Sequence, residues 1–261
     1  QGDSASPTAP TSPSFPLPPT QPPTLIGYPT TAQPLEFAQL ETILIHHLNP
    51  TAQPLTENQV TPDAFTQALQ TPAPAFHFSG HGSHNSENPN TSALYLAHDH
   101  PFTLEDLNSL PTIPIPLICL AACETGITAT GEFINEFVGF PAVFLKKGSQ
   151  TILSTLWTVN ETSSMIFVVE FFRHYQTHHN PTAAFHHAQT HLQTLTWSGL
   201  AQWYRAASDP NLKRTIRDGL KSLASNIEDD PDRHPPDQTP YAMPYHWAGF
   251  ILTTAAHDAH P

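Results

Sequence analysis

The sequence predicts a three-layer α/β/α sandwich with a mainly parallel central sheet. Short apolar segments alternate with segments whose apolar residues recur at helical spacing, from residue 24 to residue 195. The segment 116–123 (PLICLAAC) is apolar throughout, which is typical of a parallel strand buried on both faces. The chain has 261 residues, which is enough to bury a sizeable core.

The first half of the domain should contain three strands and three helices. We expect the strands at 24–29, 75–80 and 94–97, and the helices at 35–48, 61–69 and 103–110. Asn49-Pro50 ends the first helix, and Pro62 suits the first turn of the second. Thr103 is the expected N-cap of the third, because its hydroxyl can accept a hydrogen bond from a free backbone N–H.

The second half repeats the alternation and then becomes helical. We expect strands at 116–123 and 150–157, helices at 133–145, 162–175 and 183–195, one or two amphipathic helices over 199–225, and a last core strand at 246–252. Lys146-Lys147-Gly148 should end the helix that precedes the second of these strands, since glycine suits the residue after a helix.

Three segments fall outside the core pattern. Residues 1–23 are rich in Pro, Ser and Thr and should form an extended linker or long loop. Residues 227–241 are polar, acidic and Pro-rich, so we expect a disordered loop. The expected domain therefore covers 24–254, followed by an unstructured tail at 255–261.

The charge balance argues against nucleic acid as a partner. Nine basic and 22 acidic residues give a net charge of −13, whereas a nucleic-acid binder shows the opposite sign or a dense basic stripe. One basic cluster has helical spacing and indicates a solvated helix face more than a phosphate site: Lys213, Arg214, Arg217 and Lys221. The negative charge suits a basic partner or substrate.

Membrane insertion and disulfide stabilisation are not expected either. No apolar run reaches the roughly 18–20 residues that cross a bilayer, and no signal peptide pattern is present. The two cysteines, Cys119 and Cys123, are too few for a disulfide scaffold and too far apart along a strand to bridge. A reducing, cytoplasmic location is the simplest expectation.

Histidine is frequent, with 17 residues, and two pairs have helical spacing. His174 with His178, and His187 with His191, could each hold a metal ion. However, no Glu follows the first His of a pair, and no third ligand is evident. We therefore expect no metal and no cofactor, and a His-rich metal-binding protein is the least favoured alternative.

Two loops carry residues suited to nucleophilic catalysis. Gly80-His81-Gly82 follows one buried strand, and Cys123 followed by Glu124-Thr125-Gly126 follows another. Open α/β sheets place their ligands at the carboxyl ends of such strands. A thiol becomes a good nucleophile when an imidazole removes its proton, and the amides of Gly82 and Cys123 could stabilise an oxyanion. Taken alone, Cys123 could also be a small buried hydrophobe, which is how we interpret Cys119.

Five segments follow one another in a specific order: FHFSGHG, SALYLA, FTLEDLNSL, LICLAACETG and GEFINEFVGFPAVFLKKGSQTILSTLWTVNE. This order, with the closing segment HWAGFIL, resembles the CHAT domain, a caspase-like relative of separase among the clan CD cysteine peptidases. The resemblance covers about residues 24–254. It implies a cytoplasmic endopeptidase that acts on a protein substrate through a thioester, with His81 and Cys123 as its dyad.

The resemblance also implies a neighbouring region of helical tetratricopeptide repeats that recruits a substrate or regulator. The first residue is Gln1, so we expect a piece of a longer product. Four positions depart from the family pattern, namely Ser79, Ala121, Thr155 and Glu161, and neither dyad position is among them. The alternative function is a catalytically weak CHAT domain that serves as an interaction or regulatory module.

Substrate choice is expected to depend on the loop after the strand at 150–157. In caspase-like folds this loop helps to build the pocket for the residue before the cleaved bond. Here it offers Trp157 as an apolar wall and Glu161 as a negative charge, with Glu124 as a further candidate. These residues favour a basic side chain before the cleaved bond. The alternative is that Glu161 only complements the positive end of the helix that follows.

Overall fold

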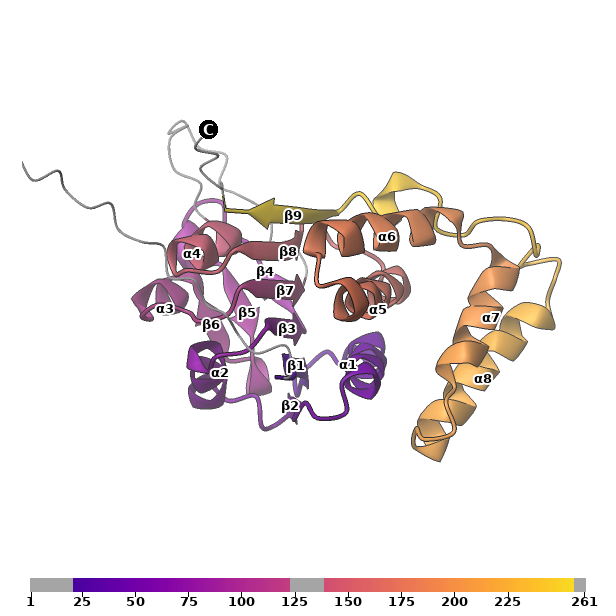
Figure 1. The fold of residues 1–261 in the computed structure, drawn as a ribbon, viewed down its shortest axis with the longest axis horizontal. Helices are drawn as coiled ribbons and strands as arrows, with labels where there is room; N and C mark the ends of the chain where they lie inside the picture. The colour runs from indigo at the N-terminus through magenta and orange to yellow at the C-terminus, as the bar shows by residue number, and fades with distance from the viewer. Residues whose placement is uncertain (1–20, 123–138, 256–261) are drawn as a thin grey trace, which may run out of the picture.

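The computed structural model describes residues 21–122 and 139–255 (Figure 1). At its centre lies a sheet in which neighbouring strands run parallel until the last, which is antiparallel. In spatial order the strands are β2 (Leu55–Glu57), β1 (Thr24–Pro29), β3 (Ala75–Ser79), β7 (Leu117–Ala121), β8 (Thr151–Thr155) and β9 (Phe250–Thr254). The predicted mainly parallel sheet is confirmed.

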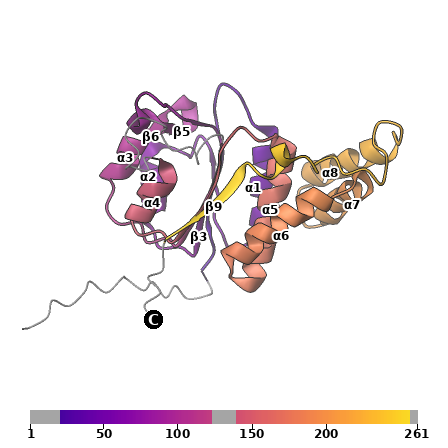
Figure 2. The same cartoon turned by 90° about the horizontal axis from the view of Figure 1, so that it is seen from above.

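Helices cover both faces of this sheet, as Figure 2 shows. One layer contains α1 (Glu36–Leu48), α5 (Glu161–His178) and α6 (Pro181–Thr194). The opposite layer contains α2 (Pro62–Gln70), α3 (Leu104–Ser109) and α4 (Phe140–Lys146). A small antiparallel sheet lies on the side of α2 and α3 and is made of β4 (Gly82–Ser83), β5 (Ala93–Tyr95) and β6 (Pro101–Thr103). The three-layer α/β/α architecture is therefore as predicted.

Strand β7 is apolar at every position because its two faces pack against two different layers of helices. Leu117 and Cys119 belong to the core beneath α1 and α5, whereas Ile118 and Leu120 belong to the core on the side of α2 and α4. Side chains alternate along a strand, so every second residue faces the same layer. A strand with helices on both sides must accordingly be apolar at every position.

Beyond α5 and α6, helices α7 (Trp197–Ala207) and α8 (Arg214–Glu228) form an antiparallel pair at one end of the molecule (Figure 2). The basic cluster lies at the start of α8, where Arg214 forms an ion pair of 3.2 Å with Asp218. Lys213, Arg214 and Lys221 are exposed. The cluster is thus a solvated helix face in this structure.

The acidic segment at 227–241, expected to be disordered, is instead held against the start of α7. The backbone N–H of Trp197 donates to the carbonyl of Gln238 over 2.9 Å, and that of Ser198 donates to Pro236 over 3.1 Å. The first N–H groups of a helix have no partner inside the helix, so this segment satisfies them. Tyr241 is buried at its end.

Other boundaries shifted by a few residues. The helix predicted at 133–145 is described only from Phe140, because residues 123–138 lie outside the described part of the chain, as do 1–20 and 256–261. The last strand begins at Phe250 and not at 246, since the short helix η3 (Pro244–His246) precedes it. Two further short helices are η1 (Pro89–Thr91) and η2 (Ala97–Asp99). Thr103 caps α3 as predicted, in a reciprocal pair with Asp106.

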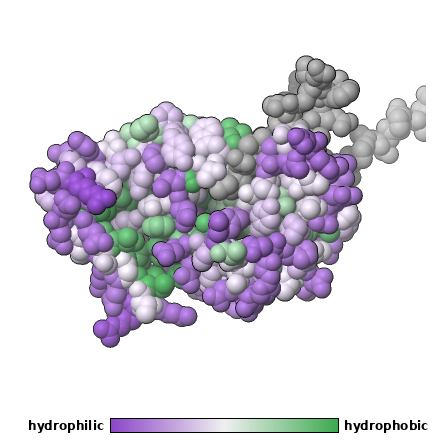
Figure 3. Space-filling model, turned by 180° about the vertical axis from the view of Figure 1, so that it is seen from behind, coloured by the Kyte–Doolittle hydropathy of each residue, from purple (hydrophilic) through white to green (hydrophobic). Residues whose placement is uncertain are grey.

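Figure 3 shows one face covered mainly by hydrophilic side chains, with hydrophobic ones gathered in a hollow beside the end formed by α7 and α8. Within residues 21–122 and 139–255, every helix is too short or too polar to span a bilayer.

Candidate active site

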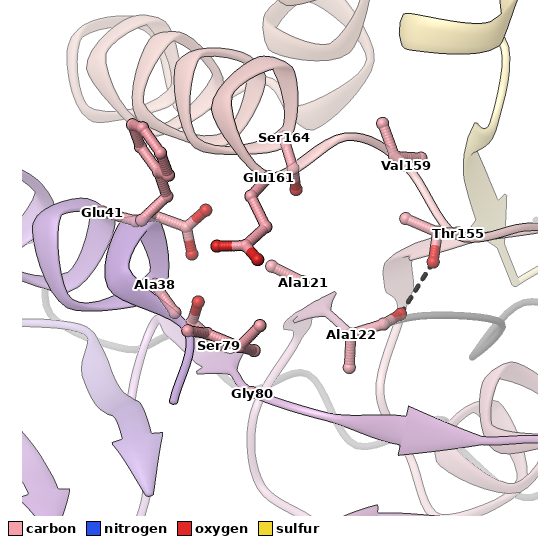
Figure 4. A pocket seen from close by; sticks show the side chains of 12 residues that line it. Ala38, Glu41, Ser79, Gly80, Ala121, Ala122, Thr155, Val159, Glu161 and Ser164 are labelled. Carbon is pink, nitrogen blue, oxygen red and sulfur yellow. Dashed lines mark hydrogen bonds between the residues drawn. The ribbon is translucent and has the colours of Figure 1, made fainter. Parts of the chain in front are cut away.

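The candidate site lies where β3, β7 and β8 end at one edge of the sheet. Ser79 and Ala121, the last residues of β3 and β7, pair in register. A small cavity of about 60 Å³ opens beyond them (Figure 4). Its lining comes from α1 with the residue before it, from the three strand ends, and from the start of α5: Leu35, Phe37, Ala38, Glu41, Ser79, Gly80, Ala121, Ala122, Thr155, Val159, Glu161 and Ser164.

The proposed nucleophile Cys123 and its neighbour Glu124 lie outside the described residues. The chain can be followed to Ala122, whose carbonyl accepts a hydrogen bond of 2.7 Å from the Thr155 hydroxyl (Figure 4). The backbone N–H of Gly80 donates to the carbonyl of Ala121 over 3.3 Å. The chain leading to Cys123 is therefore fixed to both neighbouring strands.

His81 is held in one tautomer by a backbone group. Its Nε2 lies 2.6 Å from the carbonyl oxygen of Gln33, which can only accept, so Nε2 carries the proton. In the neutral ring Nδ1 then has a free lone pair, as a general base requires. The sequence could not reveal Gln33, because any residue offers a carbonyl.

The register of β4 against β5 orients the backbone of Gly82. In the ladder between β4 and β5 the N–H of Tyr95 donates to the carbonyl of His81 over 2.9 Å, and Gly82 is opposite Leu94. This pattern makes Gly82 and Leu94 a non-hydrogen-bonded pair. The N–H of Gly82 consequently points away from β5.

Glu161 lies at the start of a helix and also borders the cavity. It is the first residue of α5, where a carboxylate complements the helix dipole, and Asn160 caps this helix by accepting from the N–H of Ser163. It also lines the cavity, and Figure 4 shows its carboxylate turned toward Ser79 and Ala121. The residue is exposed and stands at the mouth of the cavity.

A second carboxylate, Glu41 of α1, lies deeper in the same cavity. It is 2% exposed and accepts a hydrogen bond of 2.9 Å from Nε2 of His77, which is fully buried in β3. We did not identify Glu41 from the sequence. The available signal was an acidic residue within the apolar stripe of a helix, between Phe37 and Ile45, which requires a buried partner.

Trp157 does not line this cavity. Its Nε1–H donates to the carbonyl of Tyr245 over 3.1 Å, and its ring packs so closely on Gly249 that a Cβ there would be 2.8 Å from the ring. The apolar residues that line the cavity include Val159, Phe37 and Ala38. Trp157 joins the loop before α5 to the segment before β9.

Cys119 is a core residue, as expected. It is fully buried, and desolvation, with a smaller contribution from the Glu41 carboxylate, raises the pKa of its thiol well above the usual value. A thiol becomes nucleophilic by losing its proton. Cys119 is therefore inert in the folded protein.

The paired histidines form a contact between α5 and α6. The ring of His174 lies 4.2 Å from that of His178 and 4.7 Å from that of His187, measured between centroids. Partial desolvation, followed by the neighbouring imidazoles, lowers the pKa of His174. Within the described residues, no three His, Cys, Asp or Glu side chains converge as metal ligands.

Comparison with known families decides the relationship. The model of the CHAT domain family matches residues 4–255. The chain belongs to the CHAT domain family. Its fold is accordingly that of the caspase-like cysteine peptidases. Among curated proteins no match was found.

Two solved structures share features of this CHAT domain at low similarity. One is a complex of the pro- and mature domains of RgpB from Porphyromonas gingivalis, with 16% identity, 78% of this chain covered and a TM-score of 0.44. The other is the Arg-specific cysteine proteinase gingipain R, with 13% identity, 90% of this chain covered and a TM-score of 0.45. The matches cover 45% and 46% of those chains, so this chain spans less than half of their length.

Proposed function

We propose that this CHAT domain is a cysteine endopeptidase that cleaves a protein substrate after a basic residue, with His81 and Cys123 as its dyad. The observation that carries the proposal is an acidic cavity at the sheet edge to which the His81 loop and the chain before Cys123 both lead. Family membership supports the reaction class, and the cavity supports the substrate class.

The reaction divides between the two loops. His81 takes the thiol proton of Cys123 at Nδ1, since Nε2 is bound to the carbonyl of Gln33. The thiolate attacks the substrate carbonyl, and the amides of Gly82 and Cys123 stabilise the oxyanion. His81 returns its proton to the leaving amine as the C–N bond breaks, which leaves a thioester on Cys123. Water activated by His81 then hydrolyses the thioester and restores the thiol.

The cavity is suited to a cationic side chain. Glu161 lies at its mouth and Glu41 at its base. All nine Lys and Arg residues of the chain lie in the described part, and none of them lines the cavity. The ion pairs of the described residues do not include Glu161 either. An arginine or lysine of the substrate would supply the missing positive charge.

Labelling with a cysteine-reactive covalent probe tests the dyad. Cys123→Ala should abolish both labelling and peptide cleavage, and His81→Gln should reduce both by at least about 100-fold, in line with the loss of a general base. Cys119→Ala is the matched control and should keep full labelling and cleavage. Full cleavage by Cys123→Ala would exclude the assignment.

Substrate choice is tested with peptides that differ only in the residue before the cleaved bond. We expect cleavage after Arg or Lys, and a loss of at least about tenfold in Glu161→Gln, which corresponds to about 1.4 kcal/mol of transition-state stabilisation. The unaltered protein should cleave a peptide with neutral citrulline at this position more slowly than the Arg peptide. The Glu161→Gln substitution should change the cleavage rate of the citrulline peptide little. Preference for Asp would exclude the basic pocket.

The surroundings of the enzyme remain proposals that follow from the family. They are a cytoplasmic location and a helical-repeat region that brings the substrate to the domain. A folded protein that neither reacts with the probe nor cleaves any peptide would instead favour a CHAT domain that acts as an interaction or regulatory module.

A further inference from the structure

A second, larger hollow adjoins the acidic cavity. It has a volume of about 840 Å³ and shares Phe37, Val159 and Glu161 with the cavity. Its lining comes from the start of α1 with the segment just before it, from residues 158–162, and from the segment before β9. The two spaces therefore adjoin each other at these three residues.

The hollow carries the most exposed large apolar side chains of the described residues. Met243 is 68% exposed and Tyr245 is 47% exposed, and both line it. Pro34 and Phe37, from the start of α1 and the segment before it, also line the hollow. We refer to these four residues as the apolar shelf. Clustered exposed apolar residues in a groove mark a binding surface more often than a chance feature of the surface.

The shelf is fixed to the loop that carries Glu161. The hydroxyl of Tyr245 donates to the carbonyl of Thr158 over 2.9 Å, and its own carbonyl accepts from Nε1 of Trp157. His246 lies 3.2 Å from the hydroxyl of Ser163 in the first turns of α5. These three hydrogen bonds hold the segment that carries the exposed side chains in one position. Such anchoring lowers the entropy lost when a ligand binds.

We propose that the apolar shelf is a subsite for an apolar side chain of the peptide substrate, within a few residues of the basic one. The inference rests on the proposed function and adds a second determinant of specificity to it. The occupant follows from continuity, because a peptide whose basic side chain reaches Glu161 must continue past a neighbouring surface. Methionine is flexible and polarisable, and tyrosine is flat and rigid, so together they suit leucine-sized or aromatic groups.

The test measures binding and does not depend on turnover. The full chain with Cys123→Ala is titrated against fluorescent peptides that contain one Arg and carry Leu, Ser or Lys at each of two positions on either side. At one position the Leu peptide should bind about tenfold more tightly than the Ser peptide, the change expected when one apolar side chain is partly buried. Adding Met243→Ser should remove this advantage.

The control is Ile216→Ser, a half-buried apolar residue on α8, which should leave the advantage unchanged. Equal binding of Leu and Ser peptides at every position would overturn the shelf, and so would tighter binding of Lys than of Leu. Dependence on Arg is scored separately by replacing it with citrulline. Loss of that dependence alone would reject the basic pocket and leave the shelf, whereas absence of binding by every peptide would reject both.

Discussion

The two faces of the central sheet differ in how their cores are built. On the side of α2, Phe65 contacts three other rings, those of Phe76, Phe78 and Phe102, at centroid distances of 4.8 to 5.6 Å. On the side of α1 and α5 lie both buried carboxylates of the described residues, Glu41 and Glu170, each with hydrogen-bond partners. Ring contacts occur on this side too, such as that of Phe167 with Phe250, so the buried carboxylates are what distinguishes the two cores.

The buried carboxylate Glu41 connects the core beneath α1 to the candidate site. Glu41 is buried, yet its carboxylate also borders the cavity at the sheet edge. Placing a carboxylate there costs desolvation free energy that His77 offsets through its hydrogen bond. A core without buried carboxylates needs no such compensation, because it gains stability from buried apolar area and ring contacts alone. We therefore expect changes on the α2 face to alter stability only, and changes to the Glu41–His77 pair to alter stability and substrate choice together.

The largest effect is expected for Phe65→Ala. Removing this ring from a fully buried position should lower the free energy of unfolding by about 3–5 kcal/mol. Denaturant unfolding measures the loss. The fraction that remains folded should react with the cysteine probe at the parent rate, and a changed rate would show that the α2 face also supports the site.

Breaking the hydrogen bond between His77 and Glu41 should lower the free energy of unfolding slightly less, and should also alter substrate choice. His77→Phe leaves Glu41 buried without its donor and should lower stability by about 3 kcal/mol. The double variant Glu41→Leu with His77→Phe should recover part of this stability but lose preference for a basic residue. Retained preference for Arg in the double variant would mean that Glu41 does not contribute to the pocket.

A smaller effect is expected for Cys119→Ala, whose side chain lies under the same helices. The loss of one buried sulfur should cost about 1 kcal/mol, at the low end of cavity-forming substitutions. In the parent protein, which contains Cys119, thiol titration under native conditions should find one reactive cysteine fewer than titration in denaturant. Reaction of Cys119 in the native state would contradict its burial.

The smallest effect is the dependence of stability on acidic pH, which we expect from the histidines between α5 and α6. Partial burial and neighbouring imidazoles lower the pKa values of His174 and His191 from the ordinary 6.5, while the nearby Glu170 opposes the shift at His191 and Arg173 adds to it. The unfolded chain then binds protons first, so stability should fall as the pH falls below about 6.5. His174→Gln should flatten this slope, and the exposed His186→Gln should not.

Periodicity and end signals in the sequence were enough to predict the order of elements and to propose a sheet edge for the candidate site. The apolar run of β7, the glycines around His81 and the cap at Thr103 each act through near neighbours, so their effects can be recognised in the chain itself. They also placed His81 and Cys123 after neighbouring parallel strands, and the strand order confirms that β3 and β7 are adjacent.

The tertiary structure alone decided which groups contact the candidate site residues. The carbonyl of Gln33 reaches His81 across 48 residues, and Glu41 reaches His77 across 36, through packing that no local pattern encodes. Trp157 faced Gly249 and not the cavity because a residue without a Cβ lies 92 positions further along the chain. The sequence determined the short-range choices through steric and hydrogen-bonding preferences. The contacts between distant segments depended on how the layers pack, which only the assembled fold specifies.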